Sequence, residues 1–319
     1  MNSYIRILNT IMRAGIFIFF MFYISACSTN TSNDSNNLNL ANAKNYAGSE
    51  WQKAYNLLCH ESPILPSSHD SNLIEPTKIF DNLSVLGREG TVVFLLETSE
   101  GYVLIDAFYS DQTESVLLSG LRQLNIDPNE IVMTIIAHAH RDHYGGAKFL
   151  QTNFNIPIAI SNEDWNLIDE QSTRFETPIY DISISDGETL KIGDTDIYTY
   201  LVPGHTPGSL GFIFPVHDGS KTYMAGLFGG TILAFDRIDN NGLNTYLESL
   251  EKFRNAASLL NVTVEIQNHP VIDDLESKLL ALNTRSPSQP NPFVINNDSY
   301  LNFINVISEC TKAELFRRL

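Results

Sequence analysis

Residues 131–143 read Ile-Val-Met-Thr-Ile-Ile-Ala-His-Ala-His-Arg-Asp-His, an apolar run that passes directly into three histidines and one aspartate. The apolar part, residues 131–137, predicts a buried β-strand. In the loop that follows, His138 and His140 can point to one side, and Asp142 and His143 to another. Neutral imidazole and carboxylate groups suit Zn²⁺. Four such residues so close together predict more than one metal ion.

Two further histidines follow predicted strands in the same way. Residues 197–202 lead into Pro203-Gly-His-Thr-Pro-Gly208, where proline and glycine predict a tight loop around His205, and residues 262–266 lead to His269. Each of these histidines, taken singly, could be structural. Three strand-terminal loops that all carry ligating side chains together predict a metal site.

Strand-like and helix-like segments alternate along the chain from Trp51 onward. The apolar runs 91–96 and 102–106 flank a turn as a hairpin. Further strands are predicted at 156–160, 190–192, 197–202, 210–216, 222–227 and 262–266, and helices at 113–124, 147–154, 243–260, 275–282 and 300–316. This pattern favours sheets covered by helices within one domain, residues 50–319.

The sequence resembles the metallo-β-lactamase superfamily over nearly all of residues 75–319. The resemblance rests on Gly101-Tyr-Val-Leu-Ile-Asp106, the His-x-His-x-Asp-His loop, Asp186-Gly-Glu-Thr-Leu and Pro203–Gly208. It implies an α/β fold, a four-layer αβ/βα sandwich with the metal site at one edge of the two sheets.

The resemblance also implies a ligand set for two Zn²⁺ ions per chain. The first zinc ion would take His138, His140 and His205, and the second would take Asp142, His143 and His269. Asp106 would orient the ligand loop rather than bind metal. Asp142 and His205 are the implied catalytic residues: zinc lowers the pKa of water, and Asp142 would orient the resulting hydroxide toward a carbonyl.

The branch of the superfamily is indicated by what the strand end at 224–231 lacks. Glyoxalase-like thioesterases, lactonases and nucleases of this superfamily usually carry a metal-bridging aspartate there, and this segment contains none. A site without a bridging side chain resembles subclass B3 metallo-β-lactamases, as do Lys278 and the stretch Asn291-Pro-Phe-Val294. The resemblance implies hydrolysis of the β-lactam amide and hence antibiotic resistance.

One departure concerns substrate binding. Lactamases of this branch carry an Asp-Ser-Leu-Ser-like run whose serines hold the substrate carboxylate, whereas this chain has Gly226-Leu227-Phe228-Gly229. We expect Thr231 or the backbone amides near Gly229 to substitute, and Tyr144 to contact the substrate. The expected substrate-binding positions are thus Tyr144, Leu227, Gly229 and Thr231, and serines at 227 and 229 should improve β-lactam turnover.

Two other functions are compatible with the same residues. One is a dizinc lactonase, thioesterase or other ester hydrolase of the superfamily, which the missing serines favour and the missing bridging aspartate opposes. The other is a non-catalytic metal-binding lipoprotein, which the full ligand set opposes.

Composition and charge limit the partners. The chain has 319 residues with 20 Lys and Arg against 37 Asp and Glu, a formal net charge of −17. Binding to nucleic acid relies on basic surfaces, so we expect a small-molecule substrate and no nucleic-acid partner.

The first residues predict export. Arg6 and Arg13 precede a short apolar run, residues 14–24, and Ile24-Ser-Ala-Cys27 resembles a bacterial lipobox. This predicts a signal peptide over 1–26, lipidation of Cys27 and a flexible Asn/Ser-rich tether over 27–49. The protein would then be periplasmic and anchored to a membrane by its lipid, with Ser28 favouring the outer membrane. The alternatives are a plain signal peptide or an uncleaved anchor.

The remaining cysteines form an even pair. In an oxidising compartment, Cys59 and Cys310 can form a disulfide. The alternative is two separate buried thiols.

Overall fold

The structure is a computed structural model that describes residues 35–59, 69–286 and 288–318. The predicted signal peptide and the lipidation site at Cys27 lie outside these residues. Within the described ranges, no helix combines the length and the apolar character that crossing a bilayer requires.

The first sheet contains seven strands in the order β1 to β7. β1 to β4 pair antiparallel, whereas β4 to β7 pair parallel. The strands are β1 (Leu73–Phe80), β2 (Leu83–Arg88), β3 (Val92–Thr98), β4 (Gly101–Ile105), β5 (Ile131–Ile135), β6 (Ile158–Ser161) and β7 (Ile182–Ile184).

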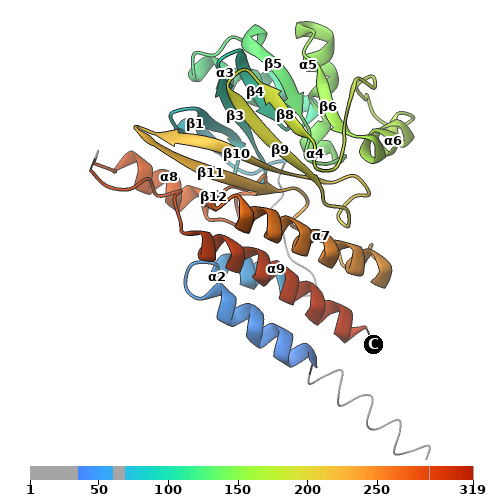
Figure 1. Cartoon of the computed structure of the whole chain (residues 1–319). Coiled ribbons are helices and arrows are strands. Elements are labelled where there is room, and N and C mark those ends of the chain that lie inside the picture. The colour runs from blue at the N-terminus through green and yellow to red at the C-terminus, as the bar shows by residue number, and fades with distance from the viewer. Residues whose placement is uncertain (1–34, 60–68, 287, 319) are drawn as a thin grey trace, which may run out of the picture.

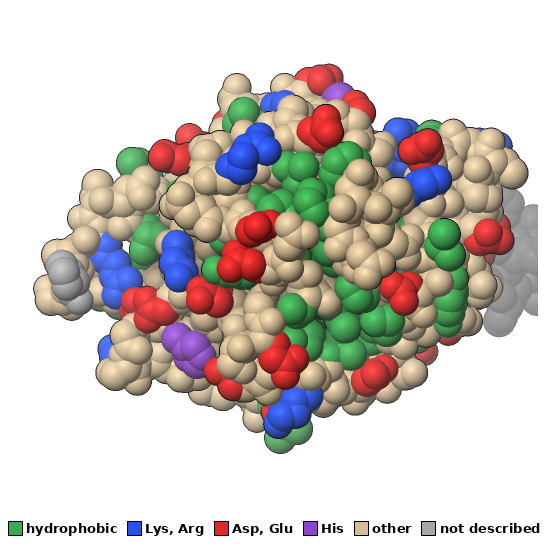
Figure 2. Space-filling model, turned by 90° about the horizontal axis from the view of Figure 1, so that it is seen from above, with side chains coloured by type: hydrophobic (Ala, Val, Ile, Leu, Met, Phe, Trp, Pro, Cys, Tyr) green, Lys and Arg blue, Asp and Glu red, His purple; other side chains and the backbone are tan. Residues whose placement is uncertain are grey.

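Helices cover the outer face of this sheet. They are η1 (Ser110–Gln112), η2 (Thr113–Leu118), α3 (Ser119–Gln123), η3 (Pro128–Glu130), α4 (Arg141–Tyr144), α5 (Ala147–Phe154) and α6 (Asn162–Gln171). Leu117, Leu121, Leu150 and Ile168 of these helices pack against the sheet in one apolar cluster. On the face shown in Figure 2, hydrophobic side chains gather near the middle and basic side chains are scattered among acidic ones.

The second sheet has five strands in the order β12-β11-β10-β9-β8. Its strands are β8 (Thr189–Ile192), β9 (Thr195–Leu201), β10 (Leu210–Asp218), β11 (Lys221–Phe228) and β12 (Val262–Glu265). Four further helices belong to this half of the molecule. They are α2 (Gln52–Leu58), α7 (Asn240–Leu259), α8 (Leu275–Asn283) and α9 (Asn297–Arg317).

The two sheets pack face to face with helices outside both, and α7 and α9 lie beneath the second sheet in Figure 1. Between the sheets lies an apolar cluster to which both contribute, for example Phe94 and Val103 from the first and Phe212 and Leu227 from the second. The predicted four-layer αβ/βα sandwich, the metallo-β-lactamase fold, is confirmed.

Strand direction brings the ligand loops to one edge. β4 runs parallel to β5, so Asp106 and the loop from His138 follow neighbouring strand ends. β9, β10 and β11 alternate in direction, and β11 runs parallel to β12. The loops that carry His205 and His269 therefore also leave their sheet at a common edge.

The predicted tether is wrong for its second half. Residues 35–47 are helical, and Asn39, Ala43 and Ala47 of this helix are buried. Ala43 and Ala47 pack in one apolar cluster with residues of α9. Asn42 Nδ2 donates a hydrogen bond to Glu309 Oε2 over 3.1 Å. The folded part thus begins before residue 50.

Cys59 and Cys310 are joined by a disulfide with their Cα atoms 4.6 Å apart. It ties the end of α2 to α9 beside the contact between Trp51 and Phe303, whose ring centroids are 4.9 Å apart. The N-terminal helices are thereby fixed to the C-terminal helix.

Candidate metal centre

Three histidines from two loops form the first ligand group. His138 and His140 follow β5, and His205 follows β9. Nε2 of His205 lies 3.0 Å from Nε2 of His138 and 2.9 Å from Nδ1 of His140. His138 is buried, whereas His140 is exposed, so the group opens to solvent at His140.

Asp142, His143 and His269 form the second group. Oδ2 of Asp142 lies 3.3 Å from Nε2 of His143 and 3.8 Å from Nε2 of His269. The opposite ring nitrogens are held elsewhere: Nδ1 of His143 is 2.7 Å from Asp106 Oδ2, and Nδ1 of His269 is 2.8 Å from the carbonyl oxygen of Gly90. Each Nε2 is therefore left to face Asp142.

Both groups fit zinc. Within each, the candidate ligand atoms lie within 4.8 Å of one another, and two nitrogens bound tetrahedrally at the usual zinc distance are about 3.3 Å apart. Nε2 of His143 is buried without a hydrogen-bond partner among the described residues. A metal ion would supply that partner.

Asp106 connects three segments of the edge. Besides His143, its carboxylate accepts hydrogen bonds from the backbone amide of Ala137 over 2.8 Å and from the side chain of Asn268. Its backbone has φ of 66°, a conformation that L-residues other than Asn and Asp rarely adopt. Asp106 thus acts as expected, orienting the ligand loop from a buried position.

The sequence reasoning missed Asp164, which links the two loops of the first group. Its Oδ2 accepts from the amide of Ala139 and the hydroxyl of Thr206, each at 2.7 Å, and its Oδ1 accepts from the amide of Gly208 at 2.8 Å. Burial raises the pKa of Asp164. The Ser161-x-x-Asp164 spacing predicts only the start of α6, where Ser161 caps the helix.

Lys278 stabilises the segment around His269 through ion pairs with two buried carboxylates. Its Nζ lies 2.9 Å from Asp273 Oδ2 and 3.5 Å from Glu265 Oε2. Burial raises the pKa of Glu265 to about 8. Lys278 therefore ties together residues on both sides of His269.

The electrostatics of the two groups differ. Burial, together with the neighbouring imidazoles, holds the pKa of His138 and of His205 well below its usual range and lowers that of His140 to about 4. In the second group, burial would lower the pKa of His143, but Asp142 and Asp106 outweigh it and raise this pKa to about 10. Burial opposes ionisation of Asp142, yet His143 and His269 hold its pKa well below normal.

Two of the predicted substrate contacts are wrong because their side chains are in the protein core. Leu227 is fully buried in the cluster between the sheets. Tyr144 is buried too, and its hydroxyl donates a hydrogen bond to Gln171 Oε1 over 2.9 Å.

Gly229 and Thr231 also form hydrogen bonds within the protein. A Cβ added at Gly229 would lie 2.2 Å from the carbonyl oxygen of Leu210, and the Gly229 amide already donates to that oxygen over 3.1 Å. The Thr231 hydroxyl donates to Gln267 Oε1 over 2.6 Å. Serine at 227 or 229 would therefore damage the fold instead of improving substrate binding.

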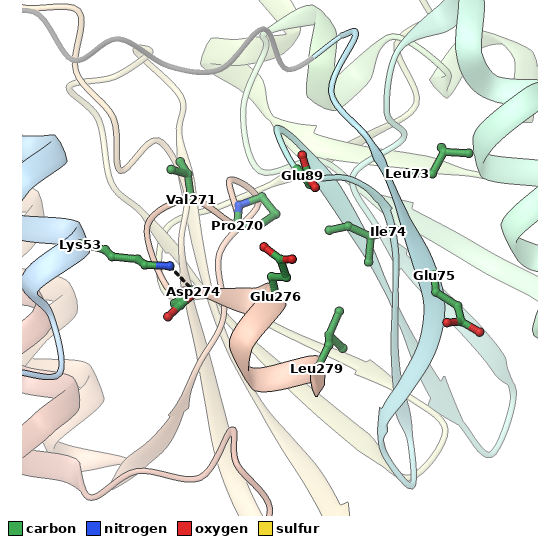
Figure 3. A pocket seen from close by; sticks show the side chains of 10 residues that line it. All are labelled: Lys53, Leu73, Ile74, Glu75, Glu89, Pro270, Val271, Asp274, Glu276 and Leu279. Atoms are coloured by element: carbon green, nitrogen blue, oxygen red, sulfur yellow. Dashed lines mark hydrogen bonds and ion pairs between the residues drawn. The ribbon is translucent and has the colours of Figure 1, made fainter. Parts of the chain in front are cut away.

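A cavity of about 370 Å³ lies near the segment that follows His269 (Figure 3). Pro270, Val271, Asp274 and Glu276 line one side, and Asp274 pairs with Nζ of Lys53 over 2.5 Å. None of the lining residues belongs to either ligand group, although Pro270 directly follows His269.

A comparison with protein-family models found a match within the chain. A family model described as the metallo-beta-lactamase superfamily matches residues 86–219. This range includes His138, His140, Asp142, His143 and His205.

Curated relatives match by sequence over parts of the chain. The hydroxyacylglutathione hydrolase GloC of Haemophilus influenzae is 33% identical over 107 residues, which are 30% of this chain and 49% of that protein. The hydroxyacylglutathione hydrolase of Prochlorococcus marinus is 27% identical over 194 residues, 56% of this chain and 74% of that protein. The chain thus spans about half of the first relative's length.

Solved structures match over more of the chain. BJP-1, a subclass B3 metallo-beta-lactamase of Bradyrhizobium japonicum, aligns with a TM-score of 0.66 at 20% identity over 76% of this chain and 94% of that one. LRA-12, a class B3 di-zinc metallo-beta-lactamase from an Alaskan soil metagenome, aligns with a TM-score of 0.65 at 18% identity. The alignment covers 79% of this chain and 96% of that one. At these identities the likeness establishes the fold.

Proposed function

Because residues 86–219 match a family model of the metallo-beta-lactamase superfamily, we propose that the protein is a two-zinc hydrolase that opens the β-lactam amide. Zinc, when bound, would polarise a carbonyl and lower the pKa of water to about 7. The two ligand groups supply three side chains each, which is the usual number for an open catalytic zinc site.

The observation that carries the choice of substrate class is the end of β11. Residues 224–231, where hydrolases of the thioesterase and lactonase type usually carry a metal-bridging aspartate, contain no aspartate. Asp142 is the single acid in the two ligand groups, an arrangement that favours the B3-like function.

Asp142 has the properties required to orient the attacking water. Its lowered pKa keeps it ionised at neutral pH, so it can accept a hydrogen bond from the water. The Thr91 hydroxyl lies 3.4 Å from its Oδ2 and restrains the carboxylate. His140 is exposed, which leaves the first group open to a substrate.

A thioester hydrolase is the second candidate. It is favoured by the sequence relatives named hydroxyacylglutathione hydrolase, which match the chain at 27–33% identity. The absence of an aspartate from residues 224–231 opposes it.

Parallel kinetics on the purified protein test the choice. A carbapenem and a cephalosporin are assayed beside S-lactoylglutathione and an acyl-homoserine lactone, before and after chelation and zinc restoration. We expect zinc-dependent turnover of the β-lactams. Turnover confined to the thioester or the lactone would overturn the proposal.

We also propose that the protein is a lipid-anchored periplasmic protein. The lipobox-like Ile24-Ser-Ala-Cys27 supports this, and so does the disulfide between Cys59 and Cys310, since disulfides persist in oxidising compartments. Replacement of Cys27 by serine should remove the protein from the membrane fraction. Unchanged fractionation and mass would contradict the anchor.

A further inference from the structure

The segment that carries His269 is a loop between two fixed points. It leaves β12 at Glu265, the last residue of that strand, and it reaches Asp273 shortly before α8 begins. His269 lies four residues from each of these acids. The middle of the loop is held at the ring, because His269 Nδ1 lies 2.8 Å from the carbonyl oxygen of Gly90. The position of the ring therefore also depends on what holds the two ends of the loop.

Lys278, on α8, joins these two ends. Its Nζ lies 2.9 Å from Asp273 Oδ2 and 3.5 Å from Glu265 Oε2, and it donates a hydrogen bond to the carbonyl oxygen of Glu265 over 3.4 Å. The side chains of Glu265 and Asp273 are 0% and 2% exposed, and that of Lys278 is 14% exposed. One ammonium group, which has three donors, thus fixes the distance between the two ends of the loop.

The two acids depend on Lys278. Neither has a second basic partner in the described part of the chain, and neighbouring Asp274 pairs with Lys53 instead (Figure 3). Glu265 Oε1 and Asp273 Oδ1 are buried without a hydrogen-bond partner among the described residues. Buried polar groups that lose their partner are costly. Without Lys278, both side chains would therefore have to move toward water, and the ends of the loop would open.

Lys278 is itself held in place by aromatic side chains. Its Nζ lies over the rings of Trp51 and Phe293, 6.0 Å and 5.5 Å from their centroids, and a cation is attracted to the face of an aromatic ring. The Trp51 ring is fixed in turn, since its Nε1 donates a hydrogen bond to the carbonyl oxygen of Ser299 over 2.9 Å. The ammonium group therefore occupies a defined position beneath the loop.

We propose that Lys278 positions His269 for the second zinc ion by holding together the two ends of the loop that carries this ligand. Lys278 is not a metal ligand and acts through the backbone on both sides of His269. The inference rests on the proposed two-zinc function. Loss of Lys278 should weaken metal binding in the second ligand group and leave the first unchanged.

The first test compares Lys278→Met with Lys312→Met. Lys312 on α9 pairs with Glu309 at 2.7 Å and serves as the matched control. Competition with a chelator measures zinc affinity in each ligand group. In Lys278→Met the affinity of the second group should fall about 10- to 100-fold, with the first group unchanged and wild-type values in Lys312→Met. Equal losses in both groups of Lys278→Met, or no loss, would overturn the proposal.

A second variant separates positioning from stability, because removal of a buried cation also destabilises the fold. The triple variant Glu265→Met, Asp273→Leu and Lys278→Met replaces the cluster by apolar side chains of similar volume, a change that commonly preserves stability. It should unfold at a urea concentration close to that of wild type and still bind zinc weakly in the second group. Recovery of zinc affinity together with stability would overturn the proposal.

The reactivity of His269 in the metal-free protein separates this inference from the proposed function. Diethyl pyrocarbonate acylates neutral imidazole, and peptide mass spectrometry gives the rate at each histidine. In Lys278→Met the rate at His269 should rise about tenfold or more, since loss of a hydrogen bond to a charged group favours opening by such a factor. The rate at His205 should not change, and Lys312→Met should match wild type.

The outcomes are distinct. If His269 becomes reactive in Lys278→Met although wild type binds a single zinc ion, the two-zinc assignment fails and the role of Lys278 stands. Unchanged reactivity of His269 refutes that role, whatever the zinc content of wild type.

Discussion

His138, His140 and His205 are held by packing, whereas the side chains of Asp142, His143 and His269 are held mainly by hydrogen bonds. In the first group the rings meet edge to face, with centroids 4.4–4.9 Å apart, and buried Nδ1 of His138 has no hydrogen-bond partner among the described residues. In the second group, Asp106 and the Gly90 carbonyl fix the outward nitrogens.

This difference has a consequence for metal binding. A hydrogen bond on one ring nitrogen fixes the tautomer and orientation of the other, which raises the basicity of the ligand. The second group is therefore preorganised and carries a negative charge from Asp142. The first group consists of neutral imidazoles whose placement depends on the steric fit of the loops.

The largest expected effect is the loss of one metal ion when a ligand is removed. His140→Ala should abolish binding in the first group, and His269→Ala in the second, each lowering affinity at its own site by more than about 100-fold. Elemental analysis at saturating zinc should give about two ions for wild type and one for each variant. Two ions in either variant would contradict the grouping.

The steric fit of the first group is tested at Gly230. Gly230→Ala places a Cβ against His205 and forces alanine into φ of 80°, at a cost of about 1–2 kcal/mol. Zinc affinity of the first group should fall while the second is preserved, as competition with a chelator can measure. Gly219→Ala also has positive φ but open space around it, and serves as the control for backbone strain. Equal losses of zinc affinity in Gly230→Ala and Gly219→Ala would show that packing against His205 does not support the first group.

The hydrogen bonding of the second group is tested at Asp106. Asn tolerates the φ of 66° and keeps one acceptor oxygen, so Asp106→Asn should fold. Its weaker hold on His143 should lower zinc affinity of the second group by about 10- to 100-fold. Asp186→Asn, at an exposed carboxylate paired with Lys252, is the control. An equal loss of zinc affinity in both ligand groups would show that Asp106 orients all the ligand loops at this edge of the sheets.

The sequence predicted the parts of the centre that are local in the chain. The His138–His143 loop follows an apolar strand, so its residue types and spacing were sufficient. Asp164 was missed because its three hydrogen bonds reach segments 25 to 44 residues away. That separation leaves no periodic signal in the sequence.

The errors in the fold have equally specific causes. Leu227 was assigned to the cleft because it stands where lactamases of subclass B3 carry a serine, but it lies within β11, which extends to Phe228, and its side chain is in the core. The helix at 35–47 was missed because Asn39, Ala43 and Ala47, spaced by four residues, replace the large apolar side chains that usually mark a buried helical face.

The last expected effect distinguishes the two groups by the protons that they release on binding metal. Without metal, His143 has a pKa of about 10 and is protonated at neutral pH, whereas His140, with a pKa of about 4, is not. Metal binding needs neutral imidazole. Zinc affinity of the second group should therefore rise about tenfold per pH unit between pH 6.5 and 8.5, and that of the first should change less.

Calorimetry in buffers of different ionisation enthalpy can measure this difference. His140→Ala reports the second group and His269→Ala the first, and about one more proton should be released by the second. The same proton also stabilises the metal-free fold. Because the pKa of His143 is raised above its unfolded value of 6.5, its contribution is complete below pH 6.5 and is lost as pH rises toward 10. Equal proton release by the two variants would mean that the hydrogen bond to Asp106 and the charge of Asp142 do not hold a proton on His143. The contrast between the two groups would then be one of packing alone.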